Sequence, residues 1–189
     1  PIGSRPLGRT GHRSSVIAMG GIVVMGEQQK YANAIVEHAL RNGVNHFDVA
    51  PSYGDAELKL GEALRGKREG IFLACKTAQR TRQGAEAEMR ASFERLQTDY
   101  FDLYQFHGLD KPEEMETVFG EDGALKAVLD AREKGRVRHI GVTGHNPDTL
   151  LAAVKRFPLD TCMFPINFVL GFHGDYGKRL MDELVQREV

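Results

Sequence analysis

The sequence predicts an α/β protein built on a parallel β-sheet, and three observations support this prediction. Short apolar segments alternate with amphipathic segments of helical period, at a spacing of about 25–35 residues. The apolar segments are almost continuously hydrophobic, as expected for strands that are covered on both faces. Polar residues directly follow several of these segments, at the sheet edge where α/β proteins build their sites. We expect one domain over residues 1–189.

The composition excludes several classes of protein. With 41% hydrophobic residues in 189, the chain can form a sizeable core. A net charge of −1 gives no reason to expect nucleic acid or a membrane surface as a partner. The longest apolar runs are far shorter than the about 18 residues of a membrane span, and no secretory signal pattern opens the chain. Cys75 and Cys162 lie in apolar segments and are expected to be reduced and buried in a cytoplasmic protein.

The chain is expected to open with a hairpin and a first strand–helix unit. Residues 5–15 are polar and contain two glycines, which predicts a β-hairpin that is too polar for the core. Residues 16–19 are apolar and precede two glycines, which predicts a short strand. Residues 28–42 have apolar positions on one helical face, and Gly43 is a suitable C-terminal stop.

Five further strand–helix units are expected. Each strand is a short apolar run, and each helix has apolar residues about three or four positions apart, with Leu58 among those of its helix. Gly135 ends one helix, and Asn146 followed by proline begins another. The strands are expected at 44–48, 71–75, 100–106, 137–142 and 161–167. The helices are expected at 55–65, 84–96, 122–134, 148–156 and 177–189.

Such a sheet can remain open and doubly wound, or it can close into a barrel. A G-x-G-x-x-G pattern does not follow the first strand, which disfavours a dinucleotide-binding open sheet. Polar residues at the ends of several different strands favour the barrel. A complete barrel has eight units and about 250 residues. The sequence therefore predicts a (β/α)8 TIM barrel that is truncated after the sixth unit and preceded by an N-terminal β-hairpin. The unpaired first and sixth strands would favour self-association.

Four polar residues are expected to meet at one mouth of this barrel: Asp48, Tyr53, Lys76 and His107. A phenol is a weak acid at neutral pH, and an adjacent ammonium group stabilises its phenolate. A buried ammonium group needs a counter-ion, which a carboxylate supplies. The set therefore predicts a general acid for a developing alkoxide, with a histidine to orient a carbonyl group. Neither a nucleophile–base pair nor a metal-ligand spacing accompanies it, so we expect a cofactor to deliver the attacking hydride.

Five segments occur in an order and spacing that are specific as a set. They are Leu-Gly-Arg-Thr-Gly at 7–11 and the segments at 47–54, 76–77, 99–107 and 135–142. In these segments the chain resembles the aldo-keto reductase family, over essentially its whole length. The resemblance implies a (β/α)8 barrel that reduces an aldehyde or ketone to an alcohol with NADPH and without a metal. It also implies that Tyr53 is the general acid, that Lys76 and Asp48 tune it, and that His107 orients the carbonyl of a small-molecule substrate.

The sequence departs from the family pattern at the nicotinamide. Family members hold its carboxamide with a Ser-Asn pair after the fifth strand and a Gln on the sixth, where this chain has Thr143, Gly144 and Met163. His145 and Asn146 are close enough in sequence to replace the lost amides. The expected cofactor-binding residues are Gly21, Ile22, Asp48, Thr143, Gly144, His145 and Met163. The loop that separates NADPH from NADH is not present, so NADH remains an alternative.

Two other functions remain open from the sequence. The chain could be a non-catalytic or regulatory barrel that binds cofactor, or an inactive fragment of a reductase. A metal-dependent barrel hydrolase or isomerase would use Asp48, His107 and His145 as ligands, although Lys76 would then place an ammonium group beside the cation. His173, after the sixth strand, is expected in a loop that shapes the substrate pocket.

Overall fold

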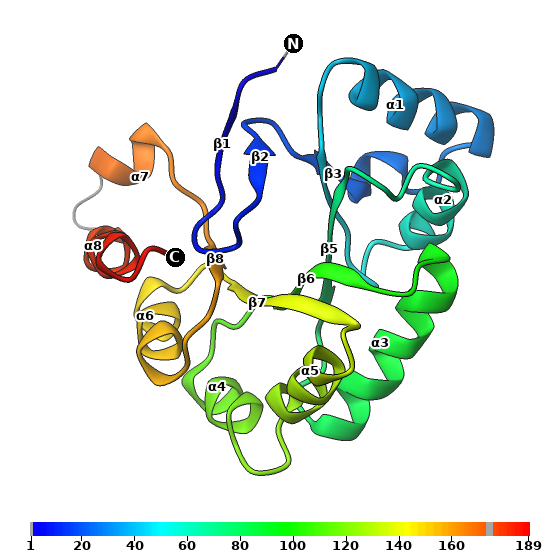
Figure 1. The fold of residues 1–189 in the computed structure, drawn as a ribbon. Helices are drawn as coiled ribbons and strands as arrows, with labels where there is room; N and C mark the ends of the chain where they lie inside the picture. The colour runs from blue at the N-terminus through cyan, green and yellow to red at the C-terminus, as the bar shows by residue number, and fades with distance from the viewer. Residues whose placement is uncertain (1, 173–175) are drawn as a thin grey trace.

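The central feature is a parallel sheet of six strands in the order β3-β4-β5-β6-β7-β8. A computed structural model describes residues 2–172 and 176–189, so His173 lies outside the described residues. Figure 1 shows that the sheet curves into a half-barrel, with the helices on its outer side. The strands are β3 (Met19–Gly20), β4 (His46–Asp48), β5 (Phe72–Thr77), β6 (Phe101–Phe106), β7 (Val137–Thr143) and β8 (Thr161–Met163). The predicted parallel α/β architecture is confirmed.

A helix follows each of these strands, as the alternating pattern predicts. The helical segments are η1 (Gly21–Val24), α1 (Gln29–Arg41), α2 (Ala56–Ala63), α3 (Arg82–Leu96), α4 (Pro112–Val118), α5 (Ala124–Glu133), α6 (Pro147–Arg156), α7 (Phe168–Phe172) and α8 (Lys178–Arg187). Two helix starts have clear local causes. Thr81 accepts a hydrogen bond from the Gly84 amide before α3, and Asn146 accepts from the Asp148 and Thr149 amides before α6.

Several predicted boundaries are wrong. The strand expected at 16–19 is shorter, because Met19 and Gly20 are its residues that pair with β4. Residues 16 and 17 lie before β3 and are more than half exposed. The strand expected at 161–167 ends at residue 163, and α7 begins only at residue 168. Helix α4 lies in a segment expected to be a loop, with Pro112 at its start. Leu58, expected on the apolar face of its helix, is 53% exposed.

The core lies between the outer face of the sheet and the helices. Phe101 of β6 stacks on Phe93 of α3, with ring centroids 4.4 Å apart. Gly61 of α2 faces the backbone of α3, where an added Cβ would lie 2.9 Å from the Leu96 Cα. Cys75 is buried in β5, Cys162 is half-buried in β8, and both thiols are free. This packing fixes the strands and hence the residues at their ends.

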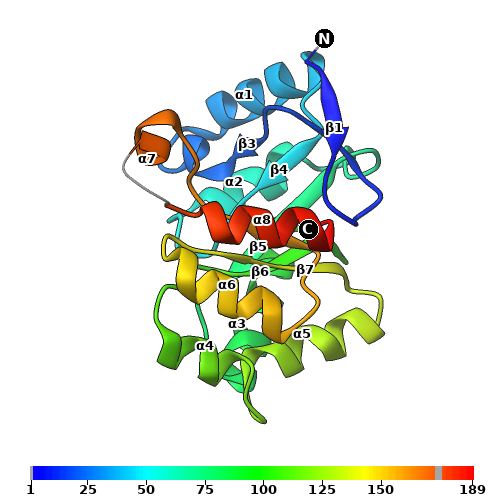
Figure 2. The ribbon, with the colours of Figure 1, turned by 90° about the vertical axis from the view of Figure 1, so that its left-hand side faces the viewer.

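The N-terminal hairpin covers the amino-terminal end of the sheet. It consists of β1 (Ser4–Pro6) and β2 (Arg13–Ser15), as predicted. The Ser15 amide donates to the Asn45 side chain at 2.8 Å, just before β4. The Arg9 guanidinium donates to the Leu159 carbonyl at 2.8 Å, just before β8. Figure 2 shows the hairpin at one end of the molecule from the side. The hairpin therefore links both halves of the sheet and leaves the carboxyl ends of the strands uncovered.

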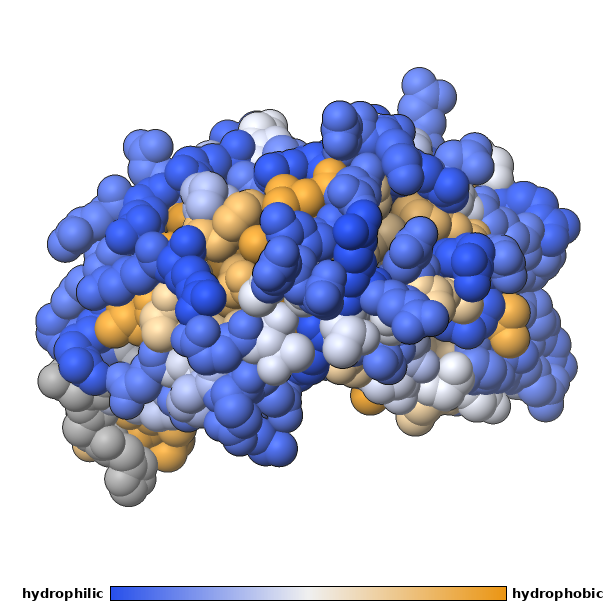
Figure 3. Space-filling view, turned by 90° about the horizontal axis from the view of Figure 1, so that it is seen from below, coloured by the Kyte–Doolittle hydropathy of each residue, from blue (hydrophilic) through white to orange (hydrophobic). Residues whose placement is uncertain are grey.

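The outer helical face is mostly hydrophilic. Figure 3 shows the molecule of Figure 1 from below. Polar residues cover most of this face, with smaller apolar areas between them. Within the part of the chain that the structure describes, no helix combines the length and hydrophobicity needed to cross a membrane.

Candidate active site

The predicted site residues lie at the carboxyl ends of neighbouring strands. Asp48 is the last residue of β4, and Lys76 is the penultimate residue of β5. His107 directly follows β6, Thr143 ends β7 and Met163 ends β8. Because the strands are parallel and hydrogen-bonded in this order, the five residues share one edge of the sheet. The structure thus brings together residues that span most of the sequence.

Lys76 and Asp48 form a buried ion pair. Lys76 is 1% exposed, and its Nζ pairs with Asp48 Oδ1. The same nitrogen donates to the Val49 carbonyl at 3.4 Å. The second carboxylate oxygen of Asp48, Oδ2, accepts a hydrogen bond from Gln105 Nε2 at 3.0 Å. Both oxygens of Asp48 therefore have donors, which offsets the cost of burying this charge.

Tyr53 lies in the loop after β4 and faces the ammonium group. Its amide donates to the Ala50 carbonyl at 3.0 Å, and Gly54 follows with φ of +54°, a conformation that favours glycine. This turn places the phenolic oxygen 3.5 Å from Lys76 Nζ, which donates to it. The ammonium nitrogen also lies 5.1 Å from the centroid of the phenol ring. Lys76 thus lies between the carboxylate and the phenol.

His107 lies beside the same phenol. The two rings are 5.8 Å apart at their centroids, with planes at 88°. Arg80 Nη2 holds the turn that carries the histidine, because it donates to the carbonyls of His107 at 2.9 Å and Gly108 at 3.1 Å. Burial, together with the positive charge of Lys76, holds the pKa of His107 below its usual value. The imidazole is therefore neutral near pH 7 and can donate one N–H to a carbonyl oxygen.

The residues expected to contact the nicotinamide lie at the ends of β7 and β8 and directly after β7. Thr143 Oγ1 accepts from the Gly108 amide at 3.1 Å, so its own hydrogen can be donated elsewhere. The Gly144 amide donates to the Met163 carbonyl at 3.1 Å. Met163 is 43% exposed at this edge. A hydroxyl donor therefore lies beside an accessible apolar side chain.

Gly21 and Ile22 begin η1, directly after β3. Gly21 is buried, and an added Cβ would lie 2.8 Å from the side chains of Val49 and Leu60. Packing alone therefore requires a glycine at this position. Ile22 is half exposed at the same edge of the sheet. The Ile22 side chain is thus accessible to a ligand, whereas close packing explains the glycine at position 21.

Asp110 organises the loop that carries His145, and sequence reasoning missed it. Its Oδ1 accepts from the amides of His145 and Asn146, the latter at 2.9 Å. Its backbone carbonyl accepts from Asn146 Nδ2 at 3.0 Å. Burial opposes ionisation, but these amide donors hold the pKa of Asp110 below its usual value. The His145 side chain is largely exposed, with Nδ1 3.4 Å from Asp110 Oδ2. Asn146 is occupied with capping α6, so His145 is the accessible one of the two.

Gln105 is a second residue that was missed. Its amide contacts Asp48 from the interior of the sheet, and it is fully buried. The sequence feature that could have indicated its role is a glutamine between Tyr104 and Phe106, in the otherwise apolar end of β6.

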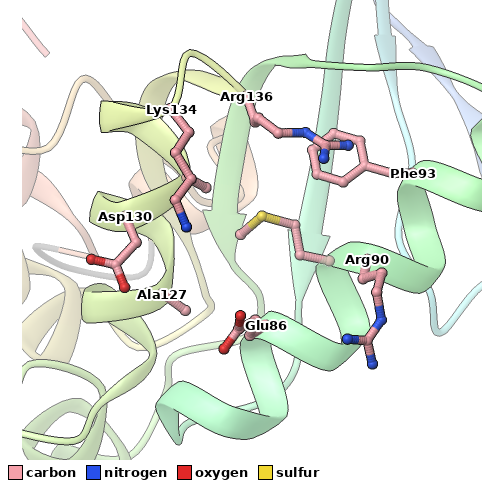
Figure 4. Close-up of a pocket in the computed structure, with 9 residues that line it drawn as sticks. Glu86, Arg90, Phe93, Ala127, Asp130, Lys134 and Arg136 are labelled. Atoms are coloured by element: carbon pink, nitrogen blue, oxygen red, sulfur yellow. The ribbon is translucent and has the colours of Figure 1, made fainter.

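A groove of about 190 Å³ lies elsewhere, between α3 and α5. Figure 4 shows Arg90 and Phe93 on one side of it and Asp130 and Lys134 on the other. The guanidinium of Arg136 stacks 4.1 Å from the Phe93 ring centroid. These residues lie on the outer helical layer, so the groove is separate from the strand-end cluster.

The metal-dependent alternative gains no support from the geometry. Asp48 already pairs with Lys76 and Gln105. Across residues 2–172 and 176–189, no group of three or more His, Cys, Asp or Glu side chains is arranged to hold a metal ion.

The chain is similar in sequence to known proteins. The chain is 33% identical to aldo-keto reductase YhdN of Bacillus subtilis over 164 residues, which cover 79% of this chain and 48% of that protein. It is 30% identical to L-galactose dehydrogenase of Arabidopsis thaliana over 176 residues, which cover 83% and 53% respectively. The chain thus spans about half the length of these relatives.

Solved structures share the fold. The holo form of an aldo-keto reductase from Bacillus halodurans superposes with a TM-score of 0.82 at 24% identity, covering 100% of this chain and 64% of that one. A glycerol dehydrogenase from Gluconobacter oxydans superposes with a TM-score of 0.71 at 21% identity, covering 87% and 55%. The model of the aldo/keto reductase family matches residues 17–171. The chain belongs to the aldo/keto reductase family.

Proposed function

We propose that the strand-end cluster reduces an aldehyde or ketone to an alcohol with a nicotinamide cofactor, NADPH in the first instance. One observation carries the proposal: the Lys76 ammonium lies between Asp48 and the phenolic oxygen of Tyr53. A buried cation in contact with a phenol stabilises the phenolate that forms when the phenol gives up its proton. The family assignment, which covers NAD(P)H-dependent oxidoreductases, supports the same reaction.

Each residue of the cluster has one task in this reaction. Tyr53 Oη donates its proton to the carbonyl oxygen as negative charge develops there. Lys76 stabilises the resulting phenolate, and Asp48 holds the ammonium in place. His107, neutral and at right angles to the phenol ring, donates a hydrogen bond to the same carbonyl oxygen. The bound cofactor supplies the hydride.

The residues present fit one end of the cofactor. The Thr143 hydroxyl offers a donor for a carboxamide oxygen, and Met163 offers an apolar surface for a ring. The exposed imidazole of His145 lies on the adjoining loop and takes the place of the missing amide. Ile22 is accessible on the other side, after β3. These residues do not determine whether NADPH or NADH binds.

The function is tested with the purified 189-residue chain. Binding of NADPH and NADH is followed by quenching of nicotinamide fluorescence, and cofactor oxidation is then followed with a panel of small aldehydes and ketones. Carbonyl-dependent oxidation supports the proposal. Binding without turnover of any carbonyl would instead identify a non-catalytic barrel that holds cofactor. Failure to bind either cofactor would reject both functions for this chain.

A further inference from the structure

Four residues lie at one level across four neighbouring strands. The strand register pairs Lys76 of β5 with Gln105 of β6, Gln105 with Gly141 of β7, and Gly141 with Thr161 of β8. Residues paired in this way in a parallel sheet direct their side chains to the same face. Gln105 therefore lies on the same face as Lys76, directly beside it.

Gly141 leaves the space that Gln105 occupies. An added Cβ at residue 141 would lie 3.2 Å from Gln105 Cγ and would also meet Thr161 Oγ1. With a glycine there, the glutamine side chain fits within the row. Its Nε2 then reaches Asp48 Oδ2 on β4 at 3.0 Å. The sheet is thus shaped to direct this amide at the carboxylate.

The stability of the core does not explain a glutamine at this position. Gln105 is fully buried, and its Oε1 has no hydrogen-bond partner among the described residues. A buried carbonyl oxygen without a partner destabilises the folded state, whereas an apolar side chain of similar length would not. Among the described residues, the one hydrogen bond of this side chain goes to Asp48, the charged partner of Lys76. The contact with Asp48 therefore explains why a glutamine occupies this buried position.

We infer that Gln105 is a positioning residue for the reaction of the strand-end cluster. A carboxylate turns easily about its last side-chain bond, because that torsion has broad minima. Gln105 holds Oδ2 of Asp48, so that Oδ1 faces Lys76 and the ammonium remains at Tyr53. The inference rests on the proposed reductase function and deepens it.

The first test replaces Gln105 with methionine, which has similar length and no amide. With Gln105→Met, we expect kcat to fall about tenfold, as for the loss of one hydrogen bond to a charged group. The KM for the aldehyde and the Kd for NADPH should stay within about twofold, and the melting temperature should not fall. Gln83→Met, at an exposed glutamine of α3, is the matched control and should change none of these. A lower melting temperature with unchanged kcat would overturn the inference.

A second variant adds a pH signature. In Gln105→Glu, the introduced carboxyl can donate an O–H to Asp48 when it is neutral, but it repels Asp48 when it is ionised. The rate relative to wild type should therefore fall as pH rises, whereas the deficit of Gln105→Met should be the same at every pH. If the rate of Gln105→Glu relative to wild type were the same at every pH, the result would contradict a role of Gln105 through Asp48.

A third measurement separates this inference from the proposed function. The side-chain amide resonances of Gln105 are identified by NMR as the pair that disappears in Gln105→Met. They should shift in Asp48→Asn and remain unchanged in Asp130→Asn, because Asp48 is the acceptor of this amide among the described residues. An unchanged pair in Asp48→Asn overturns the inference whatever the activity. A shifted pair in a chain without turnover would reject the reductase while the Gln105–Asp48 contact stands.

Discussion

The Nζ of Lys76 lies 3.5 Å from the phenolic oxygen of Tyr53 and pairs on its other side with Asp48. The three groups come from β5, from the loop after β4 and from the end of β4. Lys76 is almost completely buried, so water screens its charge weakly at the phenol. This relationship links the packing of the sheet to the chemistry proposed for its edge.

Lys76→Met should destabilise the fold, because it leaves the Asp48 carboxylate without its cation, and it should abolish most of the activity of the protein that remains folded. Loss of the ammonium group removes the stabilisation of the phenolate, and we expect the rate to fall about 100-fold or more. The measurement is NADPH oxidation with the best aldehyde of the panel, with circular dichroism as the check on folding. Lys126→Met, at an exposed position of α5, should retain wild-type activity. A Lys76→Met protein that is folded and fully active would remove the ammonium group from the mechanism.

Asp102→Ala should strongly destabilise the fold. This carboxylate is 4% exposed and accepts from Arg68 at 2.6 Å, Arg138 at 2.8 Å and the Leu73 amide at 2.9 Å. Its removal leaves the buried Leu73 amide and the partly buried Arg68 guanidinium without this acceptor, at a cost of about 3 kcal/mol in the free energy of unfolding. Urea denaturation measures the change. Asp130→Ala breaks an exposed pair with Arg82 and should cost less than about 1 kcal/mol; equal costs would contradict this account.

The protein should lose stability in acid through His46. Burial lowers the pKa of His46 from 6.5 to about 4, with Asp48 and Asp102 opposing and His12 and Lys76 adding to the shift. The folded state therefore binds this proton less readily than the unfolded chain. This contribution to the free energy of unfolding is complete above about pH 6.5 and is lost as the pH falls towards 4. At pH 4 the loss amounts to about 3 kcal/mol.

Urea denaturation between pH 4 and pH 7 measures this effect. His46→Asn should flatten the pH dependence of the free energy of unfolding, whatever its stability at pH 7. His38→Asn, at an exposed histidine of α1, should leave the slope as in wild type. An unchanged slope in His46→Asn would show that other groups cause the acid sensitivity.

Gly61→Ala should destabilise the contact between α2 and α3. An added Cβ would lie 2.9 Å from backbone atoms of Leu96 and closer still to the Arg95 carbonyl oxygen, so the helices must separate. Overpacking of this kind costs about 1–3 kcal/mol. Gly3→Ala is the control, because a Cβ there meets nothing within 4 Å. Thermal unfolding compares the two, and equal melting temperatures would contradict the packing described here.

The sequence predicted the parallel sheet and the strand-end cluster because both follow from local pattern. Apolar runs mark the strands, and Asp48, Lys76 and His107 stand at their ends in the sequence itself. Gln105 and Asp110 could not be found in this way, because their contacts depend on strand register and on loop conformation. Helix α4 could not be predicted in this way either, because the proline at its first position is common in loops as well as in the first turn of a helix.

The most direct test of the central claim is the comparison of Tyr53→Phe with wild type in NADPH oxidation. The variant keeps the ring that packs against His107 and removes only the phenolic hydroxyl. Tyr31→Phe, on the exposed part of α1, is the matched control. We predict that turnover falls at least about 100-fold in Tyr53→Phe, with NADPH affinity unchanged and the control fully active. A Tyr53→Phe protein that reduces aldehydes at the wild-type rate would show that another group provides the proton.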